Sequence, residues 1–107
     1  MIIAIPSSGK SIKSTVSNNL GRSNYIITYD TETKKYSSTP NPGADLQDGS
    51  GPKTAELVVQ SGADTLLSVE VGMKAYSVLA KARIKIELLK FGKTVKDAVE
   101  NYLNKPG

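Results

Sequence analysis

The residues of this chain that could do chemistry are small, polar or basic. The sequence contains neither Cys nor His, the two side chains that most often ligate transition metals. The polar segment 16–22, Val-Ser-Asn-Asn-Leu-Gly-Arg, lies between two apolar runs and ends in Gly21-Arg22. Such a loop offers backbone amides, hydroxyls and one guanidinium. We therefore expect it to contact a ligand that fits closely against the backbone, and not to ligate a bare transition metal.

The residue inventory argues against an enzyme. Without His and Cys there is no catalytic triad, imidazole proton shuttle or thiol nucleophile. Glu70 is the lone carboxylate at the ends of the two central strands, whereas two-metal hydrolysis needs paired carboxylates. A solvent-facing residue at a helix entry is the simpler interpretation of Glu70.

Residues 4–11, Ala-Ile-Pro-Ser-Ser-Gly-Lys-Ser, approximate a phosphate-binding loop with Ala at the first Gly position. That motif must feed directly into a helix, and residues 12–19 are poor helix formers. We interpret the match as chance, although Ser7 to Lys10 could still bind some anion.

A second glycine-rich segment, residues 48–53 (Asp-Gly-Ser-Gly-Pro-Lys), precedes a predicted helix. It could present free amides to an anion, with Lys53 adding charge. It could equally be a flexible lead-in to a helix with Pro52 at its first position. The sequence leaves both interpretations open.

Composition indicates an ordinary globular protein. The chain has 107 residues, of which 38% are hydrophobic and 22% charged, and a net charge of +4. This length predicts one domain over residues 1–107. No apolar run approaches 18 residues, so we expect no membrane span. The absence of Cys fits a cytoplasmic protein. The positive charge is dispersed and there is one Phe and no Trp, so we expect no nucleic-acid partner.

Hydrophobic periodicity predicts eight elements. Strands are expected over residues 2–5, 24–30 and 34–38, with a turn at 30–33 and a long loop over 39–52. Helices are expected from Pro52 to Gly62, from Gly72 to Arg83 and after the N-cap Thr94, alternating with strands over 65–69 and 84–89. We expect Tyr76, Leu79, Ala80 and Arg83 to share one helical spacing, and Val95, Ala98, Val99, Tyr102 and Leu103 to form an inward stripe.

The order β-β-β-α-β-α-β-α requires an antiparallel first half and right-handed parallel crossovers in the second. With the first strand beside the fourth, a ligand crevice is expected at their carboxyl ends. Residues 6–10 and 70–72 should meet there, beneath the loop over 39–52.

Several segments in this order resemble the dinitrogenase iron–molybdenum cofactor biosynthesis family. They are Ile3-Ala4-Ile5-Pro6, Val16-Ser17-x-x-Leu20-Gly21-Arg22, Tyr29-Asp30, Asn41-Pro42, Gly49 and Gly51 leading into residues 53–62, Ala63-Asp64, Gly72 with Ala75 and Leu79, Ile84-Lys85-Ile86, and residues 94–98. The resemblance implies a ribonuclease H-like α/β fold. Its mixed five-stranded sheet has the order 3-2-1-4-5, an antiparallel second strand and helices on both faces.

The resemblance also implies a function. Family members are implicated in binding or delivering nitrogenase cofactor precursors, and some relatives hold molybdenum–copper–sulfide clusters non-covalently. Many relatives carry His and Phe where this chain has Asn19 and Leu20. Because Asn is a poor ligand for soft metals, the chain either binds a preassembled anionic cluster through charge and amides, or has lost cluster binding.

We predict a small non-enzymatic carrier of a metal–sulfur cluster, of iron–molybdenum or molybdenum–copper sulfide type, that works with a donor or recipient protein and is a monomer or weak dimer. A cofactor-free protein-interaction module is the alternative, and a phosphate-ligand binder at residues 7–10 is a weaker one. The predicted cluster-binding residues are Ser8, Gly9, Lys10, Ser17, Asn19, Gly21, Arg22, Gly51, Lys53, Gly72 and Lys74.

Overall fold

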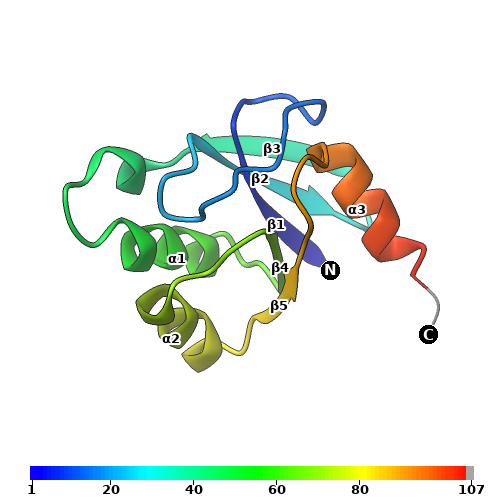
Figure 1. The fold of residues 1–107 in the computed structure, drawn as a ribbon. Coiled ribbons are helices and arrows are strands. Elements are labelled where there is room, and N and C mark those ends of the chain that lie inside the picture. The colour runs from blue at the N-terminus through cyan, green and yellow to red at the C-terminus, as the bar shows by residue number, and fades with distance from the viewer. Residues whose placement is uncertain (106–107) are drawn as a thin grey trace.

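A mixed five-stranded sheet forms the centre of the structure, a computed structural model that describes residues 1–105 (Figure 1). Residues 106 and 107, which the single-domain prediction includes, lie outside the described residues. The strands are β1 (Ile2–Ser7), β2 (Tyr25–Asp30), β3 (Lys35–Pro40), β4 (Thr65–Ser68) and β5 (Lys85–Leu88). Their order, β3-β2-β1-β4-β5, confirms the predicted sheet.

Strand directions also agree with the prediction. β2 is antiparallel to both β1 and β3, with Ile5 opposite Ile27 and Ile27 opposite Ser38. β4 is parallel to β1 and β5, as crossover connections through helices require. The sheet is therefore an antiparallel half joined to a parallel half at β1 and β4.

Helices cover both faces of the sheet, because each face is apolar and must be buried. On one face α1 (Ser50–Gln60) and α2 (Met73–Lys81) pack side by side, and on the other lies α3 (Val95–Leu103) (Figure 1). Each face has its own core: Ala4, Leu20, Ile26, Ala55, Val58, Leu66, Ala75 and Leu79 on the first, and Ile3, Ile5, Val16, Ile27, Leu67, Val95, Ala98 and Val99 on the second. Within residues 1–105 no helix is long and apolar enough to cross a membrane.

Strand β1 continues through Pro6 to Ser7, whereas the predicted strand over residues 2–5 ends before Pro6. The Pro6 carbonyl accepts from the amide of Ser17 at 2.8 Å. Since both backbone polar positions of a strand residue point to the same side, the missing N–H of Pro6 also points away from β2. The β1–β4 pairing extends only to Ala4, so proline removes no ladder bond there.

The predicted loop over 39–52 is more ordered than expected. Residues 39 and 40 belong to β3, and a short 3-10 helix, η1 (Pro42–Asp45), follows. Helix α1 begins at Ser50, two residues before the predicted start at Pro52. Pro52 fits inside the first turn because the amides of that turn have no acceptor within the helix.

Two predicted helical stripes need correction. In α2 the buried residues are Ala75 and Leu79, whereas Tyr76 is 55% exposed. Helix α2 ends at Lys81, before Arg83. In α3, Leu103 is 42% exposed and so lies outside the buried stripe that Val95, Ala98 and Val99 form. Tyr76 and Leu103 are large side chains that fit the predicted helical spacing, but each lies on the solvent-exposed face of its helix.

The turn between β2 and β3 lies where the sequence predicts it. Asp30 closes it, since its carboxylate accepts from the amides of Glu32 at 2.9 Å and Thr33 at 3.4 Å. The Glu32 amide is the main reason that the pKa of Asp30 lies below its ordinary value. Any stability from this carboxylate is present above the ordinary pKa and is lost as the pH falls through the lowered one.

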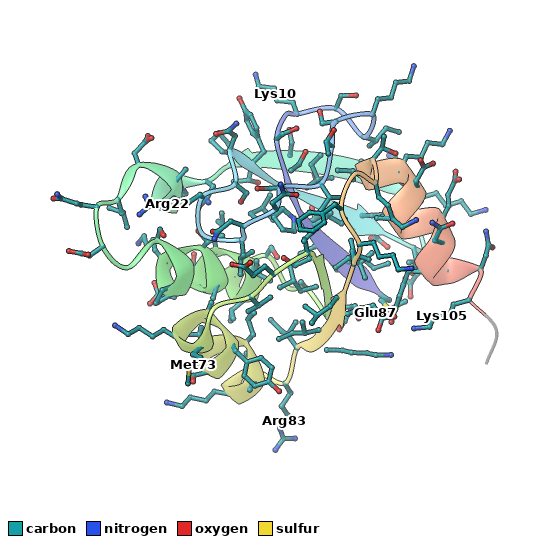
Figure 2. All side chains as sticks on the ribbon, viewed as in Figure 1. Lys10, Arg22, Met73, Arg83, Glu87 and Lys105 are labelled. Carbon is teal, nitrogen blue, oxygen red and sulfur yellow. The ribbon has the colours of Figure 1, made fainter. Side chains whose placement is uncertain are left out.

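Helix α2 ends in a Schellman motif with an arginine at the left-handed position. The Ile84 amide donates to the Leu79 carbonyl at 3.1 Å, and the Arg83 amide to Ala80 at 3.0 Å. This geometry gives Arg83 a φ of 61°, a conformation that is unfavourable for a residue with a Cβ. Its side chain projects away from the body of the molecule (Figure 2).

Replacing Arg83 with Gly is expected to stabilise the fold by about 1 kcal/mol, because glycine adopts this conformation without steric cost. Urea unfolding followed by circular dichroism measures the change. Gly62, which follows α1 with a φ of 79°, is the matched control, and Gly62→Ala should destabilise by a similar amount. Lower stability of Arg83→Gly would contradict the assignment.

Candidate functional site

The segment 16–22 forms a closely hydrogen-bonded loop between β1 and β2. The Ser17 hydroxyl donates to the Asn19 carbonyl at 3.0 Å, and the Asn19 side-chain oxygen accepts from the Arg22 amide at 3.1 Å. Val16 and Leu20 are buried and anchor it to the two cores. The Asn19 oxygen is therefore engaged in holding the loop's shape.

Gly21 lies directly on the first turn of α1. A Cβ at Gly21 would lie 2.7 Å from the amide nitrogen of Gly51 and 2.7 Å from the Ser50 hydroxyl. These separations are too short for any other residue unless the backbone moves. Glycine at position 21 is thus required by the approach of the loop to the helix N-terminus.

A buried polar cluster centred on Asn41 fixes this approach. The Asn41 side-chain amide donates to the carbonyls of Ser23 at 2.8 Å and Gly21 at 3.2 Å. Its oxygen accepts from the Thr54 hydroxyl at 2.9 Å and the Gly43 amide at 3.0 Å. Asn41 is 6% exposed, and Ser23 and Thr54 are 1% or less. One side chain therefore joins the loop, η1 and α1.

Arg22 extends from the loop toward η1 and the residues that follow it (Figure 2). Its guanidinium donates to Ala44 at 3.1 Å, to Leu46, and to Gln47 at 3.3 Å. The predicted covering segment is therefore tied to the loop by a charge-assisted set of hydrogen bonds. These contacts use several Arg22 donors, so its predicted contact with an anion would have to share the guanidinium with them.

The first turns of α1 and α2 lie side by side at the end of the loop. A Cβ at Gly51 in α1 would lie 3.6 Å from the Cβ of Ala75 in α2, so Gly51, Lys53 and Lys74 belong to adjoining first turns. Space around Gly72, the N-cap of α2, is open, with no atom within 4 Å of where its Cβ would be. Eight of the predicted site residues thus fall in the loop or in these two helix starts.

The helix starts differ in how their amides are satisfied. Thr94 caps α3 by accepting from Asp97, and the carbonyls of Ser14 and Ile12 accept from Val95 and Lys96. The N-caps of α1 and α2 are Gly49 and Gly72, and neither helix has a side-chain cap. Since helix N-termini attract anions, the α1–α2 end presents first-turn amides that no side chain caps, and the partial positive charge that accompanies them.

The remaining predicted residues, Ser8, Gly9 and Lys10, lie in a separate arm formed by residues 8–15. Its ends pair through Ser8 and Thr15, and its far side contacts the start of α3. Lys10 lies over the ring of Tyr25 at 5.9 Å, and in Figure 2 it lies well apart from Arg22 and from Met73 at the start of α2. The arm leads into turns and not into a helix, which agrees with a chance match to the phosphate-binding motif.

Sequence reasoning did not assign roles to Ser23 or Thr54. Asn41 entered only as part of the family resemblance. Thr54 in α1 could have been noticed as a polar residue on the helical spacing of Ala55 and Val58, but no local pattern identifies its partner 13 residues away.

The donor set determines what this site can hold. Among residues 1–105 no three His, Cys, Asp or Glu side chains gather to form a metal site. Amides, hydroxyls and lysines are available instead, and these groups suit an anion that arrives with its own ligands.

The fold and the site define a small α/β domain that presents two helix N-termini without side-chain caps beside a closely hydrogen-bonded loop. The chain belongs to the dinitrogenase iron-molybdenum cofactor family, whose model matches residues 1–105. This match confirms the resemblance drawn from the sequence. Among proteins of curated function, none matches the chain.

Solved structures that match this chain include two that are at least 30% identical to it. The apo form of the orange protein from Desulfovibrio gigas is 31% identical, with a TM-score of 0.91, and the match covers 96% of this chain and 87% of that one. A candidate NifB protein of the DUF35 family from Thermotoga is 35% identical, with a TM-score of 0.84, over 97% of this chain and 88% of that one.

Replacing Asn41 with Ala should destabilise the protein by about 3 kcal/mol, because buried carbonyl, amide and hydroxyl groups then lose their partner. Urea unfolding measures the loss. Asn24→Ala is the matched control, since Asn24 donates to the Ser8 carbonyl from an exposed position, and should cost at most about 0.5 kcal/mol. Equal effects of the two variants would contradict the role of Asn41.

Replacing Gly21 with Ala should cost roughly 1–3 kcal/mol, since the new Cβ pushes the loop off the start of α1. The same change at Gly72, where the space is open, should be tolerated. Amide chemical shifts report the local displacement, which we expect at Gly51 for Gly21→Ala only. Unchanged Gly51 shifts in a folded Gly21→Ala variant would count against the close approach.

Proposed function

We propose that this protein carries an anionic metal–sulfur cluster non-covalently, of iron–molybdenum precursor or thiomolybdate type, and exchanges it with a donor or recipient protein. Family membership over residues 1–105 supports a cofactor-related carrier role. The observation that carries the proposal further is the pair of adjoining first turns without side-chain caps in α1 and α2, beside the loop that Asn41 fixes.

The cluster enters this proposal as cargo that brings its own sulfide ligands. The chain has no Cys or His to replace those ligands, so the protein would contact the outer sulfides and not the metal ions. Amides at the two helix starts would donate hydrogen bonds to the sulfides, and Lys53 and Lys74 would offset negative charge.

The other predicted residues would act around this centre. Ser17, Asn19, Gly21 and Arg22 would form the wall of the binding site on the side of the loop. Residues 44–47, held by Arg22, would cover the site. Ser8, Gly9 and Lys10 lie in the separate arm, so any contribution from Lys10 would be longer-range attraction of the anion.

We propose a single domain, a cytoplasmic location and a non-catalytic role, since transfer of an intact cluster requires binding and release without bond making by the protein. A cofactor-free interaction module of the same fold is the competing function.

Tetrathiomolybdate is the probe that separates the two. Protein incubated with it and passed through gel filtration should carry molybdenum, detected by elemental analysis, and protein from its native host should absorb visible light. Molybdenum-free, colourless protein after both procedures would contradict the carrier proposal and favour the interaction module.

The double variant Lys53→Gln/Lys74→Gln should bind tetrathiomolybdate roughly tenfold more weakly, and wild-type binding should weaken as salt is added. Lys34→Gln/Lys35→Gln removes the same charge at the turn between β2 and β3, at the other end of the sheet, and should bind as the wild type does. Equal losses in both variants would mean that net charge alone, and not the helix starts, attracts the anion.

A further inference from the structure

The two edges of the sheet are built differently. Edge strand β3 reads Lys-Tyr-Ser-Ser-Thr-Pro, and its polar side chains and terminal proline are the usual protection of an exposed edge. Edge strand β5 reads Lys-Glu on one face and Ile-Leu on the other, and Leu88 is 65% exposed. An edge strand that exposes an apolar side chain is a place where a strand of another molecule can pair.

The apolar face of β5 borders a groove of about 390 Å³ between this strand and α2. Ile86 and Leu88 line it from the strand and Tyr76 from the helix, together with Val69, Val71 and Ile84. Within residues 1–105 no segment covers Leu88 or the 55%-exposed Tyr76.

The backbone of β5 is available on its outer side. Lys85 donates to Asp64 at 3.0 Å and Leu89 to the Ser68 carbonyl at 2.8 Å, so these residues face β4. Because residues alternate along a parallel ladder, the N–H and C=O groups of Ile86 and Leu88 point outward from the sheet. They can pair with an added strand.

The charges lie on the opposite face of β5, toward α3. Lys85 lies 5.6 Å from the centre of the Tyr102 ring. Glu87 accepts from Lys105 through Oε2, as Figure 2 shows for the two neighbouring side chains. The hydrogen bond from Lys105 is the main reason that the pKa of Glu87 lies below its ordinary value. Within the described residues, the other carboxylate oxygen, Oε1, accepts no hydrogen bond.

We propose that β5 pairs with β5 of a second copy of this chain, antiparallel and centred on Ile86. This register sets Lys85 opposite Glu87 of the second copy and Glu87 opposite its Lys85, so that two oppositely charged pairs form by symmetry. On the apolar face it sets Leu88 opposite Ile84 and joins the two grooves. The two Ile86 residues exchange a pair of backbone hydrogen bonds.

The charges select this occupant and this register. The register that would pair the outward groups of Ile86 with those of Leu88 is centred on Glu87, and it would set two carboxylates directly opposite each other, which is unfavourable. A strand of an unrelated protein would need its own matching charges, whereas the Lys-x-Glu spacing of β5 complements itself. The proposal concerns a surface other than the candidate cluster site and does not depend on cluster binding.

The contact is small, so self-association should be weak, with a Kd of about 0.1–1 mM. Sedimentation velocity of the full chain over increasing concentration measures it. Lys85→Glu sets Glu against Glu and Glu87→Lys sets Lys against Lys, so each variant alone should associate at least tenfold more weakly, a change of about 1.4 kcal/mol.

An equimolar mixture of Lys85→Glu and Glu87→Lys should restore association, since each charge then meets its opposite. Lys35→Glu, on edge strand β3, is the control and should associate as the wild type does. Circular dichroism checks that every variant is folded. A wild type that stays monomeric at millimolar concentration, or folded variants whose mixture does not associate, would overturn the proposal. So would amide shifts of Ile86 and Leu88 that respond to an added extended peptide but not to protein concentration.

Discussion

The buried side chain of Asn41 is the constraint on which the site depends. An amide removed from water must have its donors and acceptor satisfied, and those of Asn41 are satisfied by Gly21 and Ser23 in the loop, Gly43 in η1 and Thr54 in α1. These partners come from three different segments of the chain. Their joint satisfaction holds the loop against the start of α1, and Gly21 lets it come close enough.

The loop over residues 16–22 therefore lies beside the adjoining starts of α1 and α2, neither of which has a side-chain cap. The start of α3 is satisfied by Thr94 and by the carbonyls of the arm after β1, and the starts of α1 and α2 are not so satisfied. A chain without Cys or His can carry a metal cluster if the cluster keeps its own ligands, and this would agree with membership of a cofactor-related family. The bare edge of β5 is a separate surface, so carriage and self-association can be examined independently.

Much of the fold could be predicted from the sequence. Alternation and helical spacing predicted all five strands and three helices and their order along the chain, because these depend on local apolar patterns and short connections. The family resemblance implied the order of the strands in the sheet. The predicted end of the first strand at Pro6 and the predicted start of the first helix at Pro52 were wrong. A proline interrupts a strand or helix only where its missing N–H would have donated a hydrogen bond. The candidate site was predicted as a list of residues along the chain. Sequence could not show that Arg22 is engaged by carbonyls, or that Lys10 lies apart, because both follow from contacts between segments distant in sequence.

We propose that an anionic cluster binds at the adjoining starts of α1 and α2. Backbone amide chemical shifts, followed while tetrathiomolybdate is titrated into the protein, test it most directly. Binding at these helix starts should give saturable shifts centred on Gly51, Gly72, Met73 and Lys74, with smaller ones along the loop to Gly21. Shifts confined to the arm around Lys10 or spread over all exposed lysines would contradict it, as would the absence of any shift.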